Sequence, residues 1–564
     1  LAYLVRRLLE NGANSSFANQ IVDARIPPAT VAADPFATLA AAPAVNARLR
    51  QPPDLFGARR NAKGWDLLDP VGLAAFEVAR APFKDILFSG EPILAGRAAA
   101  GEVVKVLCPA NGQPVGTITW LDPVAAARVV ADAAAGVNWA GPEQRAKVLR
   151  RAADLYEAHA GEFFALAARE AGKTPLDAVA ELREAVDFLR YYADEAVRLS
   201  PQPRGVTLAI SPWNFPLAIF TGQIAAALAA GNAVVAKPAE QTGLIAVRAT
   251  ELLHQAGVPV PALQLCPGGG DVGGALTGVP GLAGVGFTGS TATARRIDKA
   301  LAAASPDAVL VAETGGLNAM IVDSTALPEQ AVRDIVTSAF QSAGQRCSAL
   351  RILYVQTDVQ ARIVRMLKGA MEALTVGDPW QTETDVGPVI DGPAKEKIVD
   401  HVEAARSEGR VICEVGTNKR LFVSPTVIAV PGIEALEEEI FGPVLHVATY
   451  RAEDIGKVMS AVNGKGYGLT FGLHTRIDDR VEEVVSAVRA GNLYVNRNQI
   501  GAIVGSQPFG GEGLSGTGPK AGGPLTVARL ATSASPALHL AADIGPTAPR
   551  EDVQRALDGL SARS

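Results

Sequence analysis

The region from residue 206 to residue 304 alternates short apolar runs with longer segments of helical periodicity. GVTLAIS, AVVAK and AGVGFTG each precede such a segment, as in AGVGFTG followed by STATARRIDKALAAA. Alternation of strand and helix is typical of a parallel sheet with crossover helices. A second alternating region runs from residue 309 to about residue 500. We therefore predict an α/β fold with two sheet-containing domains.

Length, composition and charge limit the class of protein. A chain of 564 residues with 48% hydrophobic and 5% aromatic residues suits an α/β enzyme of several domains. The net charge of −6 gives no reason to expect nucleic acid or an anionic membrane as a partner. The longest apolar candidate, residues 217–231, is broken by polar residues and is shorter than the roughly 18–20 residues of a membrane span. We read it as a buried helix.

The four cysteines are Cys108, Cys266, Cys347 and Cys413, which are widely spaced and form no CxxC motif or Cys/His cluster. This spacing argues against a disulfide framework and against a zinc site. We predict no metal and a cytoplasmic location.

Cys347 lies in GQRCSAL and Glu313 in VAETGG. A strand that ends in Glu-Thr-Gly-Gly places the carboxylate at the carboxyl edge of a sheet, where α/β proteins bind ligands. The glycine pair lets other backbone come close. A thiol flanked by small residues and preceded by Arg346 can be accessible, with its thiolate favoured. The pair suggests a thiolate nucleophile and a carboxylate base. An ordinary core cysteine and a surface glutamate would explain the same residues.

Asn214 lies in SPWNFP, which closes one predicted strand and opens a helix. Its side-chain amide could donate to an oxyanion that forms when sulfur attacks a carbonyl. A helix cap is the structural alternative.

Other strand ends suggest a dinucleotide site. Lys237 ends a strand in AKPAEQT and Glu240 follows it, so both could bond ribose hydroxyls, while the carboxylate would repel a 2′-phosphate and favour NAD over NADP. The glycine-rich PGGGDVGG and FTGST supply turns and a helix N-terminus suited to a pyrophosphate. EEIFGPV adds Glu439 as a second ribose contact and Phe441 as a hydrophobic wall.

SPWNFP, KPAEQT, FTGST, AETGG, GQRCSA, EEIFGPV and QPFGG occur in this order, and together they resemble the aldehyde dehydrogenase superfamily over roughly residues 96–530. The resemblance implies an aldehyde dehydrogenase fold with a Rossmann-like NAD-binding domain and an α/β catalytic domain. It implies that Cys347 attacks the aldehyde and that the Asn214 amide and the Cys347 backbone N–H stabilise the oxyanion. Hydride would pass to NAD, and Glu313 would activate the water that hydrolyses the thioester. The implied cofactor contacts are Ser211, Pro212, Trp213, Lys237, Glu240, Gly270, Gly274, Phe287, Thr288, Gly289, Ser290, Gly315, Glu439 and Phe441.

Three further stretches, GKTPLDAVAELREAVDFLRYYA, SAGQRCSALR and GAIVGSQPFGG, are similar to L-glutamate-γ-semialdehyde dehydrogenase, also called Δ1-pyrroline-5-carboxylate dehydrogenase. The similarity implies that Glu184 meets the substrate's α-ammonium and that two aromatic rings enclose its aliphatic stem. A solvated helix face for Glu184 and a core position for Phe509 are the structural alternatives. The implied substrate contacts are Glu184, Phe215, Ser348, Gly501, Ala502 and Phe509.

YLVRRLLENGANSSF resembles the last helix of the proline dehydrogenase barrel in bifunctional proline utilization A, where Tyr3, Arg6, Arg7 and Glu10 would share one helix. The missing initiator Met leads us to expect a chain cut from a longer protein, with the proline dehydrogenase domain as its missing partner. The expected domains are a barrel remnant (1–20), a linker (21–95), the NAD-binding domain (96–312), the catalytic domain (313–500), and a segment with the substrate anchor loop, a return to the NAD-binding domain and a tail (501–564).

The related enzymes carry a β-hairpin after the RYYA helix that helps to build a dimer. Here only residues 194–205 occupy that place, which is too short for the hairpin and leaves a homodimer open. The predicted function is NAD-dependent oxidation of L-glutamate γ-semialdehyde to L-glutamate in proline catabolism. The alternatives are an aldehyde dehydrogenase for another substrate and a catalytically silent scaffold.

Overall fold

The computed structural model describes residues 4–5, 17–42, 49–96, 100–416 and 419–533, in two units that comprise Leu1–Asn61 and Ala62–Ser564. The first unit contains helices α2 (Phe17–Val22), α3 (Pro28–Val31) and α4 (Pro35–Ala41) and the 3₁₀ turn η1 (Pro52–Asp54). Most of the predicted helix over residues 1–20 lies outside the described residues, including its Tyr3, Arg6, Arg7 and Glu10. The predicted tail beyond residue 533 lies outside them as well.

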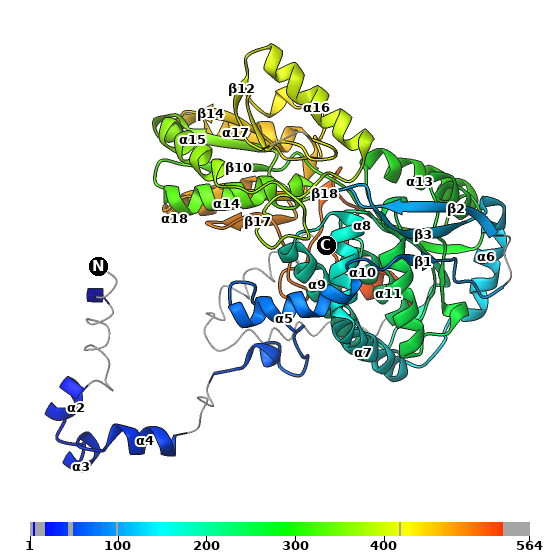
Figure 1. The fold of residues 1–564 in the computed structure, drawn as a ribbon, viewed down its shortest axis with the longest axis horizontal. Helices are drawn as coiled ribbons and strands as arrows, with labels where there is room; N and C mark the ends of the chain where they lie inside the picture. The colour runs from blue at the N-terminus through cyan, green and yellow to red at the C-terminus, as the bar shows by residue number, and fades with distance from the viewer. Residues whose placement is uncertain (1–3, 6–16, 43–48, 97–99, 417–418, 534–564) are drawn as a thin grey trace. The chain divides into compact units, whose positions relative to one another are not determined.

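The first sheet of the second unit is parallel, with the strand order β7-β6-β5-β8-β9. On β6, Val234 and Ala236 pack into one core cluster while Ala233 and Val235 pack into another, so the sheet is buried on both faces. Its strands are β5 (Val206–Ile210), β6 (Ala233–Lys237), β7 (Leu263–Leu265), β8 (Leu282–Thr288) and β9 (Val309–Glu313). The helices between them are α10 (Ala218–Ala229), α11 (Gly243–Ala256), α12 (Gly270–Thr277) and α13 (Thr291–Ala304), of which Figure 1 labels α10, α11 and α13.

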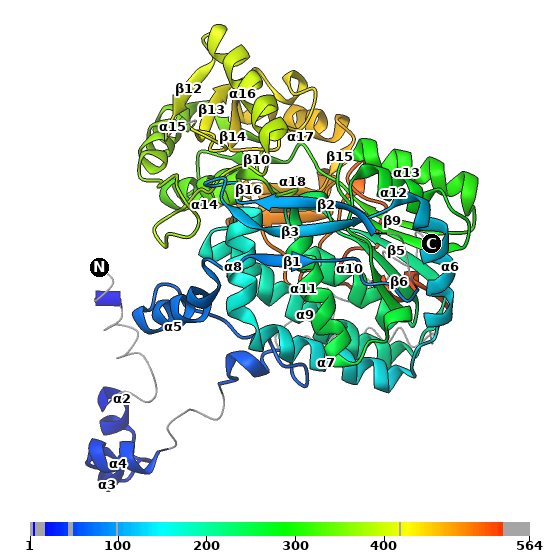
Figure 2. The ribbon, with the colours of Figure 1, turned by 45° about the vertical axis from the view of Figure 1, so that its right-hand side comes forward.

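The second sheet has the order β12-β13-β14-β11-β10-β16-β17 and is parallel except for β12. Alternate residues of β10 again face two clusters, with Met320 and Val322 on one side and Ala319 and Ile321 on the other. Its elements, all labelled in Figure 2 except β11 and β17, are β10 (Ala319–Val322), α14 (Pro328–Phe340), β11 (Ile352–Gln356), α15 (Thr357–Glu372), α16 (Gly392–Ser407), β12 (Val411–Glu414), β13 (Thr426–Ala429), β14 (Val444–Tyr450), α17 (Ile455–Gly464), β16 (Thr470–His474), α18 (Asp478–Ala487) and β17 (Asn492–Val495).

One short connection sets the geometry between the two sheets. β9 ends at Glu313, and residues 314–318 lead directly into the start of β10. The carboxyl edge of the first sheet therefore faces the amino edge of the second, where the chain also enters β11.

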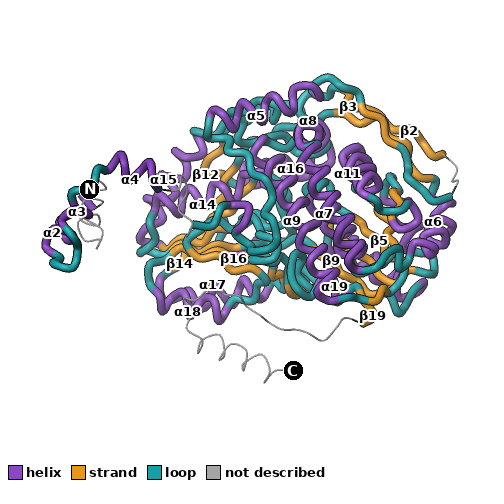
Figure 3. Tube along the Cα trace, turned by 90° about the horizontal axis from the view of Figure 1, so that it is seen from below, coloured by secondary structure: helices purple, strands orange, loops and turns teal. Residues whose placement is uncertain are grey.

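The segment before the first sheet corrects the predicted linker over 21–95. Residues 62–95 belong to the second unit, and β1 (Phe88–Gly90) pairs in parallel with β3 (Pro114–Leu121), which also pairs with β2 (Ala100–Leu107). The apolar side of α5 (Pro70–Arg80) explains this, because its Phe76 is fully buried and lies 4.7 Å from the ring of Phe164. The helices that follow are α6 (Ala126–Ala133), α7 (Pro142–Ala158), α8 (Ala160–Ala171) and α9 (Pro175–Leu199), with α7 and α9 in contact (Figure 3). His159 separates α7 from α8.

Between α9 and β5 the chain forms no hairpin, and all of these connecting residues are described. Instead β4 (Gln202–Pro203) pairs antiparallel with β19 (Ala531–Ser533), which follows α19 (Thr526–Arg529). A second short pair joins β15 (Tyr467–Gly468) to β18 (Glu512–Gly513). Among the described helices none is long and apolar enough to cross a membrane.

Candidate functional site

Two cavities meet at the facing edges of the two sheets. Cys347, Phe287, Thr288 and Thr314 line both of them. The larger cavity has a volume of about 900 Å³, within the range of roughly 300–1,000 Å³ that is usual for ligand sites. Cys347 is therefore a wall residue where the two spaces join, rather than the filler of a closed core.

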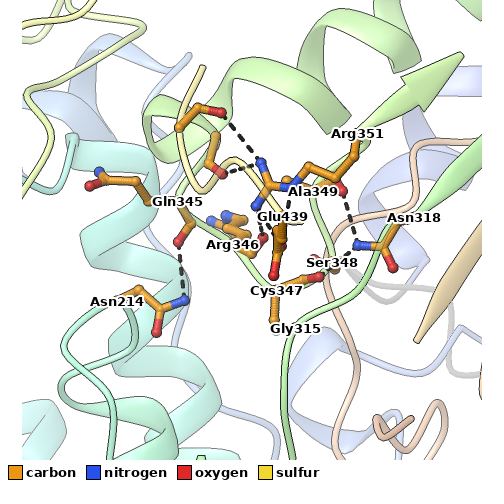
Figure 4. Close-up of polar contacts among 12 residues, drawn as sticks. Asn214, Gly315, Asn318, Gln345, Arg346, Cys347, Ser348, Ala349, Arg351 and Glu439 are labelled. Carbon is orange, nitrogen blue, oxygen red and sulfur yellow. Dashed lines mark hydrogen bonds and ion pairs between the residues drawn. The ribbon is translucent and has the colours of Figure 1, made fainter. Parts of the chain in front are cut away.

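The predicted oxyanion donor lies beside the cysteine loop. The Asn214 side-chain amide donates to the backbone carbonyl of Gln345 at 3.1 Å (Figure 4), which leaves its second N–H to point elsewhere. Helix α10 has Leu217 at its N-cap position, so the alternative that Asn214 caps this helix is wrong.

The thiol of Cys347 is neutral in the resting protein. Burial raises the pKa of Cys347 to about 12, and the carboxylates of Glu439 and Glu313 act in the same direction. The Arg346 guanidinium lowers this pKa, as expected, but burial outweighs it. The prediction of a favoured thiolate is therefore wrong for the free protein, and the thiol proton must leave during the reaction.

Glu313 ends β9, and its carboxyl group lines the smaller cavity together with Cys347. Its Oε2 accepts from the Gly511 backbone N–H at 2.8 Å, while its buried Oε1 has no hydrogen-bond partner among the described residues. Burial raises the pKa of Glu313 to about 8. A carboxyl group with one free oxygen and a pKa near neutrality suits a general base.

The Glu439 side chain lies against the backbone of Gly315, two residues after Glu313. Its Oε1 accepts from the Arg351 guanidinium at 2.9 and 3.1 Å (Figure 4). A Cβ at Gly315 would lie 1.8 Å from the Glu439 Oε2, so a larger residue there would displace the Glu439 carboxylate. The glycine pair was predicted to let other backbone come close, and the group that comes close to Gly315 is the Glu439 carboxylate.

The residues present fit a dinucleotide. Lys237 ends β6 with its side chain buried. Its ammonium donates to the Pro238 carbonyl at 2.9 Å, and the Glu240 carboxylate lies 4.0 Å away. Ser290 caps α13, whose N-terminus opens to the larger cavity. Phe441 packs edge-on against Trp213, with 5.7 Å between ring centroids. The predicted cofactor residues that line this cavity are Ser211, Pro212, Trp213, Lys237, Glu240, Gly270, Gly274, Phe287, Thr288, Gly289, Ser290, Gly315, Glu439 and Phe441.

The predicted substrate residues gather in the smaller cavity: Glu184, Phe215, Ser348, Gly501, Ala502 and Phe509 all line it. The alternatives of a solvated helix face for Glu184 and a core position for Phe509 therefore do not hold. Burial, with a smaller contribution from Glu181, raises the pKa of Glu184 to about 8. The Tyr494 hydroxyl donates to the Gly501 carbonyl at 3.0 Å, which holds the loop that contains Gly501 and Ala502.

Several residues at the site carry no motif that sequence reasoning could use. Arg351 donates to the carbonyls of Gly344, Gly442 and Arg346 as well as to Glu439. Asn318 donates to the Cys347 carbonyl at 2.6 Å, and Gln223 lies in the smaller cavity. In the sequence, these residues are marked only as polar residues within otherwise apolar or strand-like stretches. Among the described residues no group of three or more His, Cys, Asp or Glu could hold a metal.

Comparisons with known proteins give one consistent answer. Residues 97–532 match the aldehyde dehydrogenase family. The bifunctional protein PutA of Rhizobium meliloti is 48% identical over 100% of this chain and 47% of its own length, and the 1-pyrroline-5-carboxylate dehydrogenase of a Geobacillus species is 36% identical over 80% of this chain and 93% of its own. A crystal structure of a Bradyrhizobium japonicum proline utilization A variant superposes with a TM-score of 0.83 at 46% identity, covering 94% of this chain and 54% of that one. The chain thus spans about half the length of the bifunctional relatives it matches.

Proposed function

This chain belongs to the aldehyde dehydrogenase family, and on that premise we propose that it oxidises an aldehyde to a carboxylic acid with Cys347 as the nucleophile. One observation carries the proposal: Cys347 lies where the two cavities meet, so it can reach a substrate in one and a dinucleotide in the other. The family is generally NAD(P)-dependent, and a bound nicotinamide would accept the hydride. We propose NAD, because a 2′-phosphate beside Lys237 would approach the Glu240 carboxylate.

The chain's own groups account for the remaining steps. The Cys347 sulfur bonds to the aldehyde carbon as the thiol proton passes to water in the cavity, and the Asn214 amide with the Cys347 backbone N–H holds the negative oxygen. After oxidation, the free Oε1 of Glu313 takes a proton from a water molecule as that water attacks the thioester. Cleavage of the carbon–sulfur bond releases the acid, and the proton held by Glu313 passes to the sulfur and restores the thiol.

The smaller cavity supports L-glutamate γ-semialdehyde as the substrate. Its polar lining includes an acid, Glu184, and a hydroxyl with backbone groups at Ser348 and Gly501, while Phe215 and Phe509 are apolar. This combination matches an ammonium, a carboxylate and an aliphatic stem. Relatives named 1-pyrroline-5-carboxylate dehydrogenase support the same assignment, and those named bifunctional PutA support a place in proline catabolism beside a proline dehydrogenase domain. A homodimer and a cytoplasmic location stay predictions.

The test is NADH formation with L-Δ1-pyrroline-5-carboxylate, which equilibrates with the semialdehyde, compared with propanal. We expect turnover with the first substrate that disappears in Cys347→Ala. Turnover with propanal alone would overturn the substrate assignment and keep the family chemistry. If the folded protein forms no NADH with either substrate, the alternative of a catalytically silent scaffold would be supported.

A further inference from the structure

The loop that carries Cys347 has an unusual backbone. After α14 ends at Phe340, Ser342, Ala343 and Gly344 follow one another with φ of +56°, +54° and +67°. Only glycine adopts this left-handed region without cost, and the first two residues here carry a Cβ. Such a backbone persists only where its surroundings hold it.

A buried carboxylate lies against this loop. Asp177, in the first turn of α9, has a side chain with 0% exposure. Its Oδ1 accepts from Arg346 at 2.6 Å and from Gln341 at 2.8 Å, and its Oδ2 accepts from Ser342 at 2.7 Å. The fourth donor, Thr174, belongs to its own helix.

Three of the four donors therefore come from the cysteine loop, on both sides of the left-handed residues. The carboxylate stays ionised, because Arg346 and Lys173 with the neighbouring hydroxyl and amide lower the pKa of Asp177 to about 2 despite its burial. A buried charge with all its donors satisfied is a rigid anchor, and removing it would leave those donors unpaired.

We propose that Asp177 is a positioning residue that holds the loop 341–346 in its left-handed turn and so presents the Cys347 sulfur to the cavity. The proposal rests on the proposed function in taking Cys347 as the nucleophile. It acts through the loop, since Asp177 lines neither of the two cavities that meet at Cys347.

Removing the Asp177 carboxylate has two effects on the alkylation rate of Cys347, and they have opposite signs. One comes from the lost charge and the other from the altered position of the loop. Loss of the negative charge alone would free the Arg346 guanidinium to lower the thiol pKa further, which speeds alkylation of Cys347 at neutral pH. Loss of position lowers the alkylation rate at every pH. A net fall in the rate, measured at a fixed pH below the thiol pKa, is therefore opposite to the charge effect and reports the loss of position.

The experiment measures the rate constant for iodoacetamide alkylation of Cys347 at one fixed pH, by mass spectrometry of its peptide, and needs neither substrate nor cofactor. We expect Asp177→Asn to lower this rate constant about tenfold, because small displacements of a reacting group are costly. Adding Ala343→Gly should bring the rate back to within about threefold of the wild type, since glycine adopts the left-handed turn unaided. Glu170→Gln is the matched control: Glu170 is a fully buried carboxylate that accepts from the backbone of Leu244 and Ile245, away from the loop.

An unchanged or higher rate constant in folded Asp177→Asn, an equal fall in Glu170→Gln, or no recovery with Ala343→Gly would each overturn the proposal. If Asp177→Asn fails to fold, Ser342→Ala decides, with an expected fall of about threefold and an unchanged rate constant as the contrary result. Failure of the semialdehyde assay would overturn the proposed function and leave this alkylation test intact.

Discussion

Glu313 and Glu184 both have a pKa raised to about 8 by burial, yet we expect them to govern different kinetic constants. Glu313 has its free oxygen beside Cys347 and acts on the bound thioester, so its ionisation should set kcat. Glu184 meets the substrate's ammonium in the proposed complex, so its ionisation should set KM. Varying the pH therefore separates two carboxyl groups that titrate together in the free protein.

The magnitude follows from the pKa. A group with a pKa of about 8 is ionised in about one molecule in ten at pH 7. We therefore expect kcat at pH 7 to be about one-tenth of its alkaline plateau, provided that hydrolysis limits turnover. KM should fall over the same interval by up to about tenfold, as Glu184 becomes the anion that pairs with the ammonium.

The assay is steady-state NADH formation from about pH 6 to about pH 9 with three proteins. Glu313→Gln should lower the kcat plateau about 100- to 10,000-fold and remove its rise with pH. Glu184→Gln should remove the pH trend in KM and keep that in kcat. A kcat that stays flat over this pH range, as the ordinary Glu313 pKa of 4.5 would give, or a rise that survives in Glu313→Gln, would refute the assignment.

Three further outcomes follow from single contacts. Arg351→Met should lower the free energy of unfolding by about 3–5 kcal/mol in urea titrations, because the buried Arg351 donates to the carbonyls of Gly344 and Arg346 and pairs with Glu439, and Glu439→Gln in the same chain should recover part of this loss. Gly315→Ala should weaken NAD binding about tenfold by calorimetry, since its Cβ would displace Glu439, while Gly456→Ala, with open space around its Cβ, should leave binding unchanged. Asn214→Ala should lower kcat about 100- to 1,000-fold with a nearly unchanged melting temperature, because the change removes one neutral hydrogen bond, to the Gln345 carbonyl, from the described structure.

The elements of the first sheet were predictable because their patterns are local. AVVAK is buried on both faces and can only be a central strand, and β6 covers that stretch, Ala233–Lys237. The site residues at strand ends, such as Lys237 and Glu313, follow from the same logic, since parallel strands end at one edge. The resemblance to known motifs added the substrate residues, which no periodicity marks.

Other features depend on contacts between distant parts of the chain. The raised pKa of Cys347 comes from burial and from Glu439, which lies far along the sequence, so the adjacent Arg346 was a misleading guide. Residues 62–95 look like a linker because Pro and Gly interrupt them, and only the pocket around Phe164 shows where Phe76 packs. Asp177 follows a Thr-Pro helix start and reads as an ordinary member of a first turn, although its partners lie at Gln341, Ser342 and Arg346.

The connection 314–318 between β9 and β10 has a consequence for how this protein can vary. An extended residue spans about 3.3 Å, so inserting or deleting one residue in this bridge would shift Glu313 against the Cys347 sheet by several times the roughly 0.5 Å that catalysis tolerates. Its length acts as a ruler between base and nucleophile. Some residues of the 314–318 connection can therefore be substituted, but we expect an insertion or deletion there to abolish activity.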